Sequence, residues 1–576
     1  MKRVSVSRTF VNKTFVRTFA SRTFKLADME PRLKTTARPP RLSRARPLPL
    51  LLCLLFVAPG AQARDDYPRR PELDALQYRI RLALSDADDQ INAETEIVFA
   101  VRREGVREVA LDLAGLTVEG VTENGRPAKF DRADARLRVA LSSAYRAGDL
   151  VTLAVKYRGA PADGLFFKRN RHGDRTVFAD NWPDRARHWF PSIDHPYDKA
   201  RVEFFVTAPA RYDVVANGRL VETTSRQDGT RLTHWREDAP VPVYCMVFGA
   251  TEFAVVDAGA WNGARLTHYL YPRDRERGLR DHGRALRMLE LYSNLFGPYP
   301  YEKLALVQSS TRFGGMENSS AIFFDENAYD GSGGLEGTVA HEIAHQWFGD
   351  SVTESDWHHL WLSEGFATYF GAVFFERADG RDAFLRVMRG AKERYLADAG
   401  AVARPVYDPE VKDLFKLLNR NNYEKGGWVL HMLRRVVGDE QFFAGVADYY
   451  RAHRDGNALT EDFRRALELR AGRDLGWFFR QWIYEPGFPA LEASWGWDEA
   501  AKRLRLRVRQ TQAGPAFRLP LDVEFADADG GAPRRETVEV AGRDQTFDFK
   551  LERRPPAVAL DPDEWVLKTL TLREEK

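Results

Sequence analysis

The stretch His341-Glu342-Ile343-Ala344-His345 decides the fold of this chain, because it has the spacing of a metal site on a helix. Side chains four positions apart lie on one face of an α-helix, so the imidazoles of His341 and His345 can reach the same cation. Glu342 lies about 100° further round the helix, where it can face a water molecule at the metal instead of binding the metal. The pentapeptide therefore predicts a zinc-binding helix.

A third ligand is expected downstream, because a catalytic zinc takes three protein ligands and leaves a fourth position open. Glu364 in Trp361-Leu362-Ser363-Glu364-Gly365 is the candidate, with eighteen residues between it and His345. Burying two histidines and two glutamates together is costly unless a cation organises them. The alternative is a solvated helix face with two unrelated histidines, since a chance match occurs in roughly 1% of proteins of this size.

The pattern around these ligands predicts two helices. We expect the first helix at about residues 334–348, ending before Gly349, with the second starting near Ser363 as its N-cap. Leu335, Val339 and Trp347 form the face of the first helix that we expect to pack on the core.

The composition is that of a large folded protein. The 576 residues are enough for three or four domains, and thirteen Trp, twenty Tyr and thirty-six Phe can fill their cores. Cys53 falls in the leader described next, so Cys245 is the only cysteine of the remaining chain. No intrachain disulfide is then expected, and zinc must be held by histidine and carboxylate.

Residues 1–63 have the features of a basic leader that contains an export signal. They carry thirteen Lys or Arg and two Asp or Glu, so the remaining chain has a net charge of −8 against +3 overall, and no nucleic-acid binding is predicted. The apolar run at 48–58 precedes Ala61-Gln62-Ala63, which has the form of a cleavage site. The run is too short to span a membrane. We expect an exported protein, periplasmic or secreted, with no stable membrane span after signal cleavage. Translation from Met29 would leave an ordinary signal peptide, and a disordered basic extension is the alternative for the first 28 residues.

Apolar periodicity changes twice along the remaining chain. Alternation of period two predicts an N-terminal antiparallel β domain, which we assign to 64–262. Helical periodicity, interrupted by a strand-like segment at 304–307, predicts a mainly helical catalytic domain at 263–488. Alternation then returns and predicts a small β-sandwich at 489–576. The predicted fold class is multidomain α+β.

Two further motifs flank the histidines. Gly314-Gly315-Met316-Glu317-Asn318 carries an acidic residue from a turn into a strand-like segment at 322–324, and Tyr423 opens Tyr423-Glu424-Lys425-Gly426-Gly427. Taken alone, the first is most often a simple turn, and a tyrosine in a helical region most often packs in the core or on the surface.

In this order, the four motifs resemble those of the aminopeptidase N family of zinc metallopeptidases, which are gluzincins. The resemblance spans nearly the whole exported chain and implies a β domain, a thermolysin-like domain and a β-sandwich. Many relatives continue into a large helical domain that is not seen here, so we expect a more open active site.

The resemblance implies a role for each polar residue of the site. His341, His345 and Glu364 would hold one Zn²⁺ per chain. Glu342 would act as general base and then pass the proton to the leaving amine. Tyr423 would donate a hydrogen bond to the developing oxyanion.

The resemblance also implies how a peptide binds. Glu317 would pair with the free α-ammonium group, and Asn318 belongs to the same substrate-binding segment. The backbone beside Gly314 and Gly315 would bind the substrate as an added strand. Met316 would line the pocket for the N-terminal side chain.

The chain departs from the family at the second anchor for the amine. Many relatives carry a Gln-x-Glu segment there, and the corresponding stretch is Asp180-Asn181-Trp182-Pro183, judged from the following Arg187 and Asp194-His195-Pro196. Asp180 is the predicted substitute.

The sequence therefore predicts a zinc aminopeptidase that acts on peptides with a free N-terminus. An inactive peptide-binding scaffold is one alternative, although such proteins usually lose a ligand or the residue equivalent to Glu342. An epoxide hydrolase using the same zinc site is a second, and an endopeptidase remains open if Glu317 is structural. The sequence carries no signal for an oligomeric state.

Overall fold

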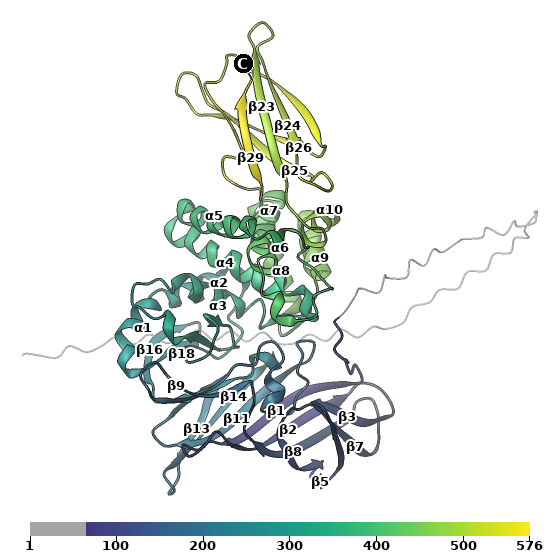
Figure 1. The fold of residues 1–576 in the computed structure, drawn as a ribbon, viewed down its shortest axis with the longest axis vertical. Coiled ribbons are helices and arrows are strands. Elements are labelled where there is room, and N and C mark those ends of the chain that lie inside the picture. Colours follow the sequence, from purple (N-terminus) through teal and green to yellow (C-terminus); the bar gives the residue numbers. More distant parts are fainter. Residues whose placement is uncertain (1–64, 576) are drawn as a thin grey trace, which may run out of the picture. The chain divides into compact units, whose positions relative to one another are not determined.

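Alternating burial along the strands builds the N-terminal part of the protein. The computed structural model describes residues 65–575, so the predicted leader and the start at Met29 lie outside the described residues (Figure 1). In β1 (Leu73–Ala83), Tyr78, Ile80 and Leu82 are buried, whereas Arg81 between them is exposed. This alternation places one face of the sheet on the core.

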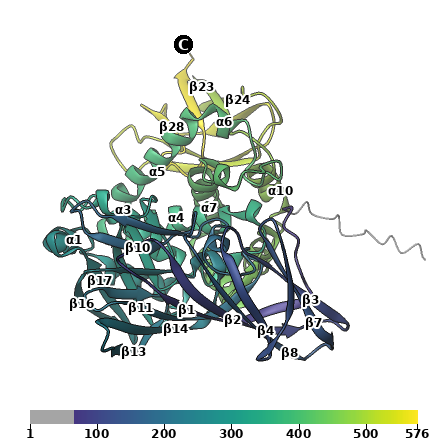
Figure 2. The same ribbon diagram turned by 60° about the horizontal axis from the view of Figure 1, so that its bottom comes forward.

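Three sheets make up the N-terminal part (Figure 2). Their strand orders are β13-β14-β11-β1-β2-β8-β4-β5, β12-β15-β10-β9 and β3-β7-β6. All neighbours pair antiparallel except β1 and β11, so the predicted antiparallel domain is confirmed with one parallel pair. The remaining strands are β2 (Ile91–Val101), β3 (Val106–Asp112), β4 (Thr117–Glu123), β5 (Arg126–Pro127), β6 (Lys129–Ala133), β7 (Arg136–Tyr145), β8 (Leu150–Gly159), β9 (Leu165–Arg169), β10 (Arg175–Ala179), β11 (Lys199–Pro209), β12 (Asp213–Ala216), β13 (Arg219–Ser225), β14 (Thr230–Pro242) and β15 (Phe248–Thr251).

A five-stranded mixed sheet follows, with the order β16-β17-β18-β20-β19. β17, β18 and β20 run parallel to one another, and the edge strand β19 pairs antiparallel with β20. The domain boundary predicted after residue 262 falls inside the β16–β17 hairpin. The bounds are β16 (Ala254–Trp261), β17 (Ala264–Leu270), β18 (Lys303–Ser309), β19 (Gly315–Met316) and β20 (Ala321–Asp325).

Helices cover this sheet and continue beyond it. No helix among residues 65–575 has the length and apolar character needed to cross a membrane. The helices, with two short strands that pair parallel, are α1 (Arg275–Asp281), α2 (Ala285–Phe296), α3 (Glu336–His345), β21 (Val352–Glu354), α4 (Trp361–Asp379), α5 (Arg381–Ala397), α6 (Ala399–Val402), α7 (Gly426–Val437), α8 (Asp439–His453), β22 (Gly456–Ala458), α9 (Thr460–Ala471) and α10 (Gly476–Phe479).

The two predicted helices form, but their ends differ from the prediction. α3 is shorter, because residues 346–348 turn away and Phe348 forms a bridge with Val352. α4 begins at Trp361, so the prediction of Ser363 as N-cap is wrong. Ser363 lies inside α4 instead, where its side chain is buried. The predicted core packing of Leu335, Val339 and Trp347 is confirmed.

The C-terminal residues form the predicted small β-sandwich. Its sheets have the orders β27-β24-β23-β29 and β26-β25-β28. Phe525 and Phe549, from the two sheets, lie with ring centroids 4.9 Å apart, and Arg435 of α7 pairs with Asp522 of β25. The bounds are β23 (Ala490–Asp498), β24 (Arg503–Gln510), β25 (Leu519–Phe525), β26 (Arg534–Val540), β27 (Asp544–Lys550), β28 (Val558–Leu560) and β29 (Thr569–Glu574).

One half-buried cation joins the N-terminal sheet to the segment after α3 and to β22. The Lys199 ammonium, at the start of β11, donates to the carbonyls of Asp350, Ser351 and Gly456 at 2.8, 2.7 and 3.2 Å. Burial lowers the pKa of Lys199 to about 8. Three carbonyls would lose their donor without this side chain, and buried polar groups without partners are costly.

We expect Lys199→Met to lower the melting temperature by several degrees, because the lost contacts are worth about 3 kcal/mol. Differential scanning calorimetry measures this. Lys156→Met is the matched control, since Lys156 on β8 is exposed and lies 3.7 Å from Glu94. Equal melting temperatures for the two variants would show that Lys199 does not stabilise the contact between the N-terminal sheet and the catalytic domain.

Candidate metal centre

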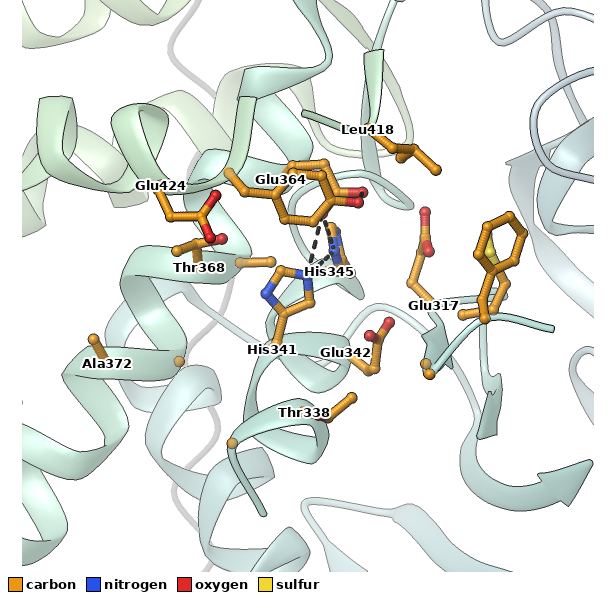
Figure 3. A pocket seen from close by; sticks show the side chains of 18 of the residues that line it. Glu317, Thr338, His341, Glu342, His345, Glu364, Thr368, Ala372, Leu418 and Glu424 are labelled. Atoms are coloured by element: carbon orange, nitrogen blue, oxygen red, sulfur yellow. Dashed lines mark hydrogen bonds and ion pairs between the residues drawn. The ribbon is translucent and has the colours of Figure 1, made fainter. Parts of the chain in front are cut away.

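Two helices bring three ligand atoms to a common point (Figure 3). The Nε2 atoms of His341 and His345 on α3 lie 3.0 Å apart, and each lies 3.2 Å from Oε2 of Glu364 on α4. Ligands of a tetrahedral zinc ion, with bonds of about 2.0–2.1 Å, lie about 3.3 Å from one another. The structure therefore brings the three predicted ligands together at the spacing that one ion requires.

The outer contacts of His345 fix which of its nitrogens faces the ligand group. Its Nδ1 lies 3.0 Å from the Phe348 carbonyl and 3.0 Å from the Ser363 hydroxyl. A proton on Nδ1 can be donated to the carbonyl, which leaves Nε2 free to bind a metal. Gly349 makes room for this arrangement, because a Cβ there would lie 2.4 Å from the Ser363 hydroxyl oxygen.

A close approach of backbones brings Tyr423 to Glu364. Tyr423 lies in a single π-helical turn, Asn421–Lys425, directly before α7. A Cβ on Gly365 would lie 3.0 Å from the backbone of Gly426, so glycine lets α4 approach this turn closely. The Tyr423 hydroxyl donates to Oε1 of Glu364 at 2.7 Å.

The electrostatics of the ligand group favour a cation at this site. Burial disfavours the charged form of Glu364, but the charge of His345 and hydrogen bonds from both imidazoles hold its pKa well below its usual range. Burial also opposes the charge on His345, yet Glu364 and Glu317 raise the pKa of this histidine. Burial lowers the pKa of His341. The buried Glu364 carboxylate thus favours a positive charge at this point, which a metal ion can supply.

Two more carboxylates lie beside the ligands. Glu317, Glu342 and His345 each offer an atom within 4.8 Å of the others. A Cβ on Gly315 would lie 2.2 Å from Oε1 of Glu342, so a side chain there would have to displace this carboxylate. Burial raises the pKa of Glu317 to about 7, and it raises the pKa of Glu342 well above its usual range. A positive charge nearby would lower both pKa values.

All these groups open onto one cavity of about 580 Å³. That volume lies in the range of pockets that bind small ligands. The predicted residues that line it are Gly314, Gly315, Met316, Glu317, His341, Glu342, His345, Glu364 and Tyr423. Asn318 is fully buried and does not line the cavity, and its amide lies 3.5 Å from the Met316 carbonyl.

The structure does not bring Asp180 to the cavity. Its carboxylate is buried in an ion pair with Arg185, which also pairs with Asp163 at 3.0 Å. The residue of this stretch that lines the cavity is Trp182, whose ring packs edge-on against Phe313 at 6.1 Å. Arg185 thus neutralises the charge of Asp180 inside the protein. The ring of Trp182 lines the cavity where a second anchor for the substrate amine was expected.

Sequence reasoning missed two charged residues of the cavity, Glu424 and Arg394. Oε1 of Glu424 accepts from Arg394 at 2.8 Å and from Arg420 at 2.6 Å. Glu424 directly follows Tyr423, so the motif itself could have indicated it. Arg394 lies on α5, and no local pattern marks it.

Two imidazoles and one carboxylate around a common point, beside an open cavity, define a mononuclear metal centre of the kind found in zinc hydrolases. Comparison with known proteins agrees. The Peptidase family M1 domain matches residues 281–482, and the Peptidase M1 N-terminal domain matches residues 74–245. Together these stretches cover more than half of the chain. The protein belongs to the M1 family of peptidases.

Curated relatives carry related names. The chain is 28% identical over 485 residues to a probable M1 family aminopeptidase 1 of Encephalitozoon cuniculi, covering 78% of this chain and 54% of that protein. It is 29% identical over 455 residues to tricorn protease-interacting factor F2 of Thermoplasma acidophilum, covering 74% and 53%. The chain thus spans about half the length of these relatives.

A solved structure shares the fold. The M1 zinc metallopeptidase of Deinococcus radiodurans superposes with a TM-score of 0.63 and 23% identity, covering 73% of this chain and 95% of that one. The predicted multidomain fold class is confirmed.

We expect Glu364→Gln to lower the affinity for zinc more than about 100-fold, because a neutral amide replaces a charged ligand and outer contacts alone are worth 10- to 100-fold. Competition with a chelator measures this. Glu336→Gln is the control, since Glu336 also belongs to the α3–α4 region but pairs with Arg284. Unchanged zinc affinity in Glu364→Gln would exclude Glu364 as a ligand.

Proposed function

We propose that this protein is a zinc-dependent aminopeptidase that holds one zinc ion per chain and removes N-terminal residues from peptides. The observation that carries the proposal is the position of Glu317, a buried carboxylate in the same cavity as the ligand group and Glu342. The names of the relatives support it. The signal-like stretch before residue 64 supports action outside the cytoplasm, in the periplasm or after secretion.

His341, His345 and Glu364 are the residues that would hold the zinc. When bound, zinc acts as a Lewis acid that polarises a carbonyl and acidifies water. Glu342 faces the cavity beside the ligands, and no hydrogen bond within residues 65–575 engages its carboxylate. It is therefore free to take a proton from the attacking water and to deliver it to the leaving amine.

Tyr423 supplies a neutral hydrogen-bond donor. Burial and the charge of Glu364 raise the pKa of Tyr423 well above its usual range, so its hydroxyl keeps its proton. The hydroxyl lies 2.7 Å from Oε1 of Glu364, at the edge of the ligand group, where a substrate oxyanion would develop. A donor held there stabilises negative charge in the transition state.

Glu317 selects the free N-terminus. A substrate α-ammonium would lower the pKa of Glu317 from about 7 and form a charge-assisted hydrogen bond with it. The edge strand β19, with Gly315 and Met316, lies beside it and offers backbone groups to an extended peptide. Nothing within residues 65–575 favours the inactive scaffold or the epoxide hydrolase.

Blocking the substrate amine tests the proposal. We expect N-acetylation of an aminoacyl anilide to lower kcat/KM about 100-fold or more, because the buried Glu317 then faces a neutral group. Steady-state hydrolysis of the two anilides by the zinc-loaded protein measures this. Equal kcat/KM values for the free and the acetylated anilide would contradict the aminopeptidase proposal and favour an endopeptidase.

We expect Tyr423→Phe to lower kcat 10²- to 10³-fold, because one oxyanion donor is lost. This corresponds to a rise of about 3 kcal/mol in the activation free energy. Zinc content, measured by metal analysis, should stay close to one per chain. Tyr484→Phe is the matched control, since its hydroxyl also donates to a carboxylate, Glu461, at 2.9 Å. An unaltered kcat in Tyr423→Phe would exclude Tyr423 as the hydrogen-bond donor to the oxyanion.

A further inference from the structure

The catalytic cavity carries opposite charges at its two ends. Glu317 lies at one end, within 4.8 Å of His345 and Glu342. Glu424 lies on the other side of the histidines, next to Thr368 (Figure 3). Glu424 holds Arg394, whose Nε donates to it at 2.8 Å. An acidic group and a guanidinium thus lie at opposite ends, with the ligand group between them.

We propose that Arg394 binds the C-terminal carboxylate of short peptides, so that the preferred substrates are small peptides with both termini free. This inference rests on the proposed aminopeptidase function, which fixes the amine at Glu317. A peptide anchored there places its first carbonyl at the ligand group, and its following residues run past His341 toward Glu424 and Arg394.

Arg394 is the only Lys or Arg that lines the cavity among residues 65–575. Its side chain, on α5, is 52% exposed, and Glu424 is its one hydrogen-bond partner in the described part of the chain. That contact uses Nε, so the terminal nitrogens of the guanidinium remain available. A guanidinium presents several N–H groups in a fixed plane that suits a carboxylate.

Glu424 orients this guanidinium without cancelling its charge. The Glu424 side chain is 4% exposed and pairs with both Arg394 and Arg420, so the three residues carry a net charge of +1. Arg420 does not line the cavity, so Arg394 is the group that presents positive charge there, and the ionisable residues of the lining outside this cluster are three glutamates and two histidines. A substrate carboxylate is therefore favoured at this end and disfavoured at the end that carries Glu317.

The apolar part of the cavity lining suits the body of a peptide. Ala372 and Phe375 of α4 and Val387 of α5 line the cavity and supply apolar surface. The volume of about 580 Å³ is finite, so a long peptide would have to carry its C-terminus beyond Arg394. The carboxylate contact is thus expected to favour short substrates.

The test compares a tripeptide, Leu-Gly-Gly, with its C-terminal amide, using the zinc-loaded full chain. We expect kcat/KM to be about five- to tenfold higher for the free acid, because Arg394 forms a charge-assisted contact in a partly exposed site. In Arg394→Met this ratio should fall to about one. The ratio does not depend on the fraction of folded enzyme, so partial misfolding leaves it readable.

Arg389→Met is the matched control. Arg389 lies on the same helix, is 48% exposed, and pairs with Glu564 away from the cavity. It should keep the ratio of the unmodified protein. Equal kcat/KM for acid and amide in the unmodified protein, or a ratio unchanged by Arg394→Met, would overturn the proposal and leave Arg394–Glu424 as a surface ion pair. Failure to hydrolyse a leucine anilide as well would instead refute the proposed function, and this inference with it.

Discussion

The structure depends on holding three ligand atoms within about 3 Å of one another inside a folded protein. His341 and His345 are one turn apart on α3, but Glu364 comes from α4 and must be brought to them. Burying such polar and charged groups together is costly, and a cation between them offsets that cost. Glycines make the approach possible, because Gly349 and Gly365 lie where a side chain would collide with Ser363 or with the turn that carries Tyr423.

The same arrangement sets the chemistry of the surrounding carboxylates. Glu317 and Glu342 are buried beside a charged Glu364, so the pKa of each lies above its usual range in the absence of metal. Any positive charge that arrives favours their ionised forms. Under the proposed function, a metal would act on Glu342 as the base, and a substrate ammonium would act on Glu317. The cavity would therefore receive two cations, and each would favour the ionised form of a different carboxylate.

The sequence predicts best what local spacing determines. His341 and His345 are fixed by one helical turn, and the strands at 304–307 and 322–324 follow from their apolar runs. Helix ends were predicted less well, because Ser363 looks like an N-cap in sequence, whereas tertiary packing extends α4 back to Trp361. Arg394 could not be predicted at all. Its place at the cavity depends on how α5 packs, and a single arginine on an amphipathic helix has no distinctive pattern.

The stretch at 180–182 shows how a fold can change the recognition of an amine. Asp180 has the right charge for an anchor, but Arg185 neutralises it in the interior, and the neighbouring Trp182 reaches the cavity instead. An indole ring cannot accept a charge-assisted hydrogen bond from an ammonium in the way a carboxylate does. Under the proposed function, recognition of the substrate N-terminus therefore rests on Glu317. With one anchor for the amine instead of two, a second charged contact at the far end of the peptide gains weight in holding a short substrate in place, and Arg394 is the group positioned to provide it.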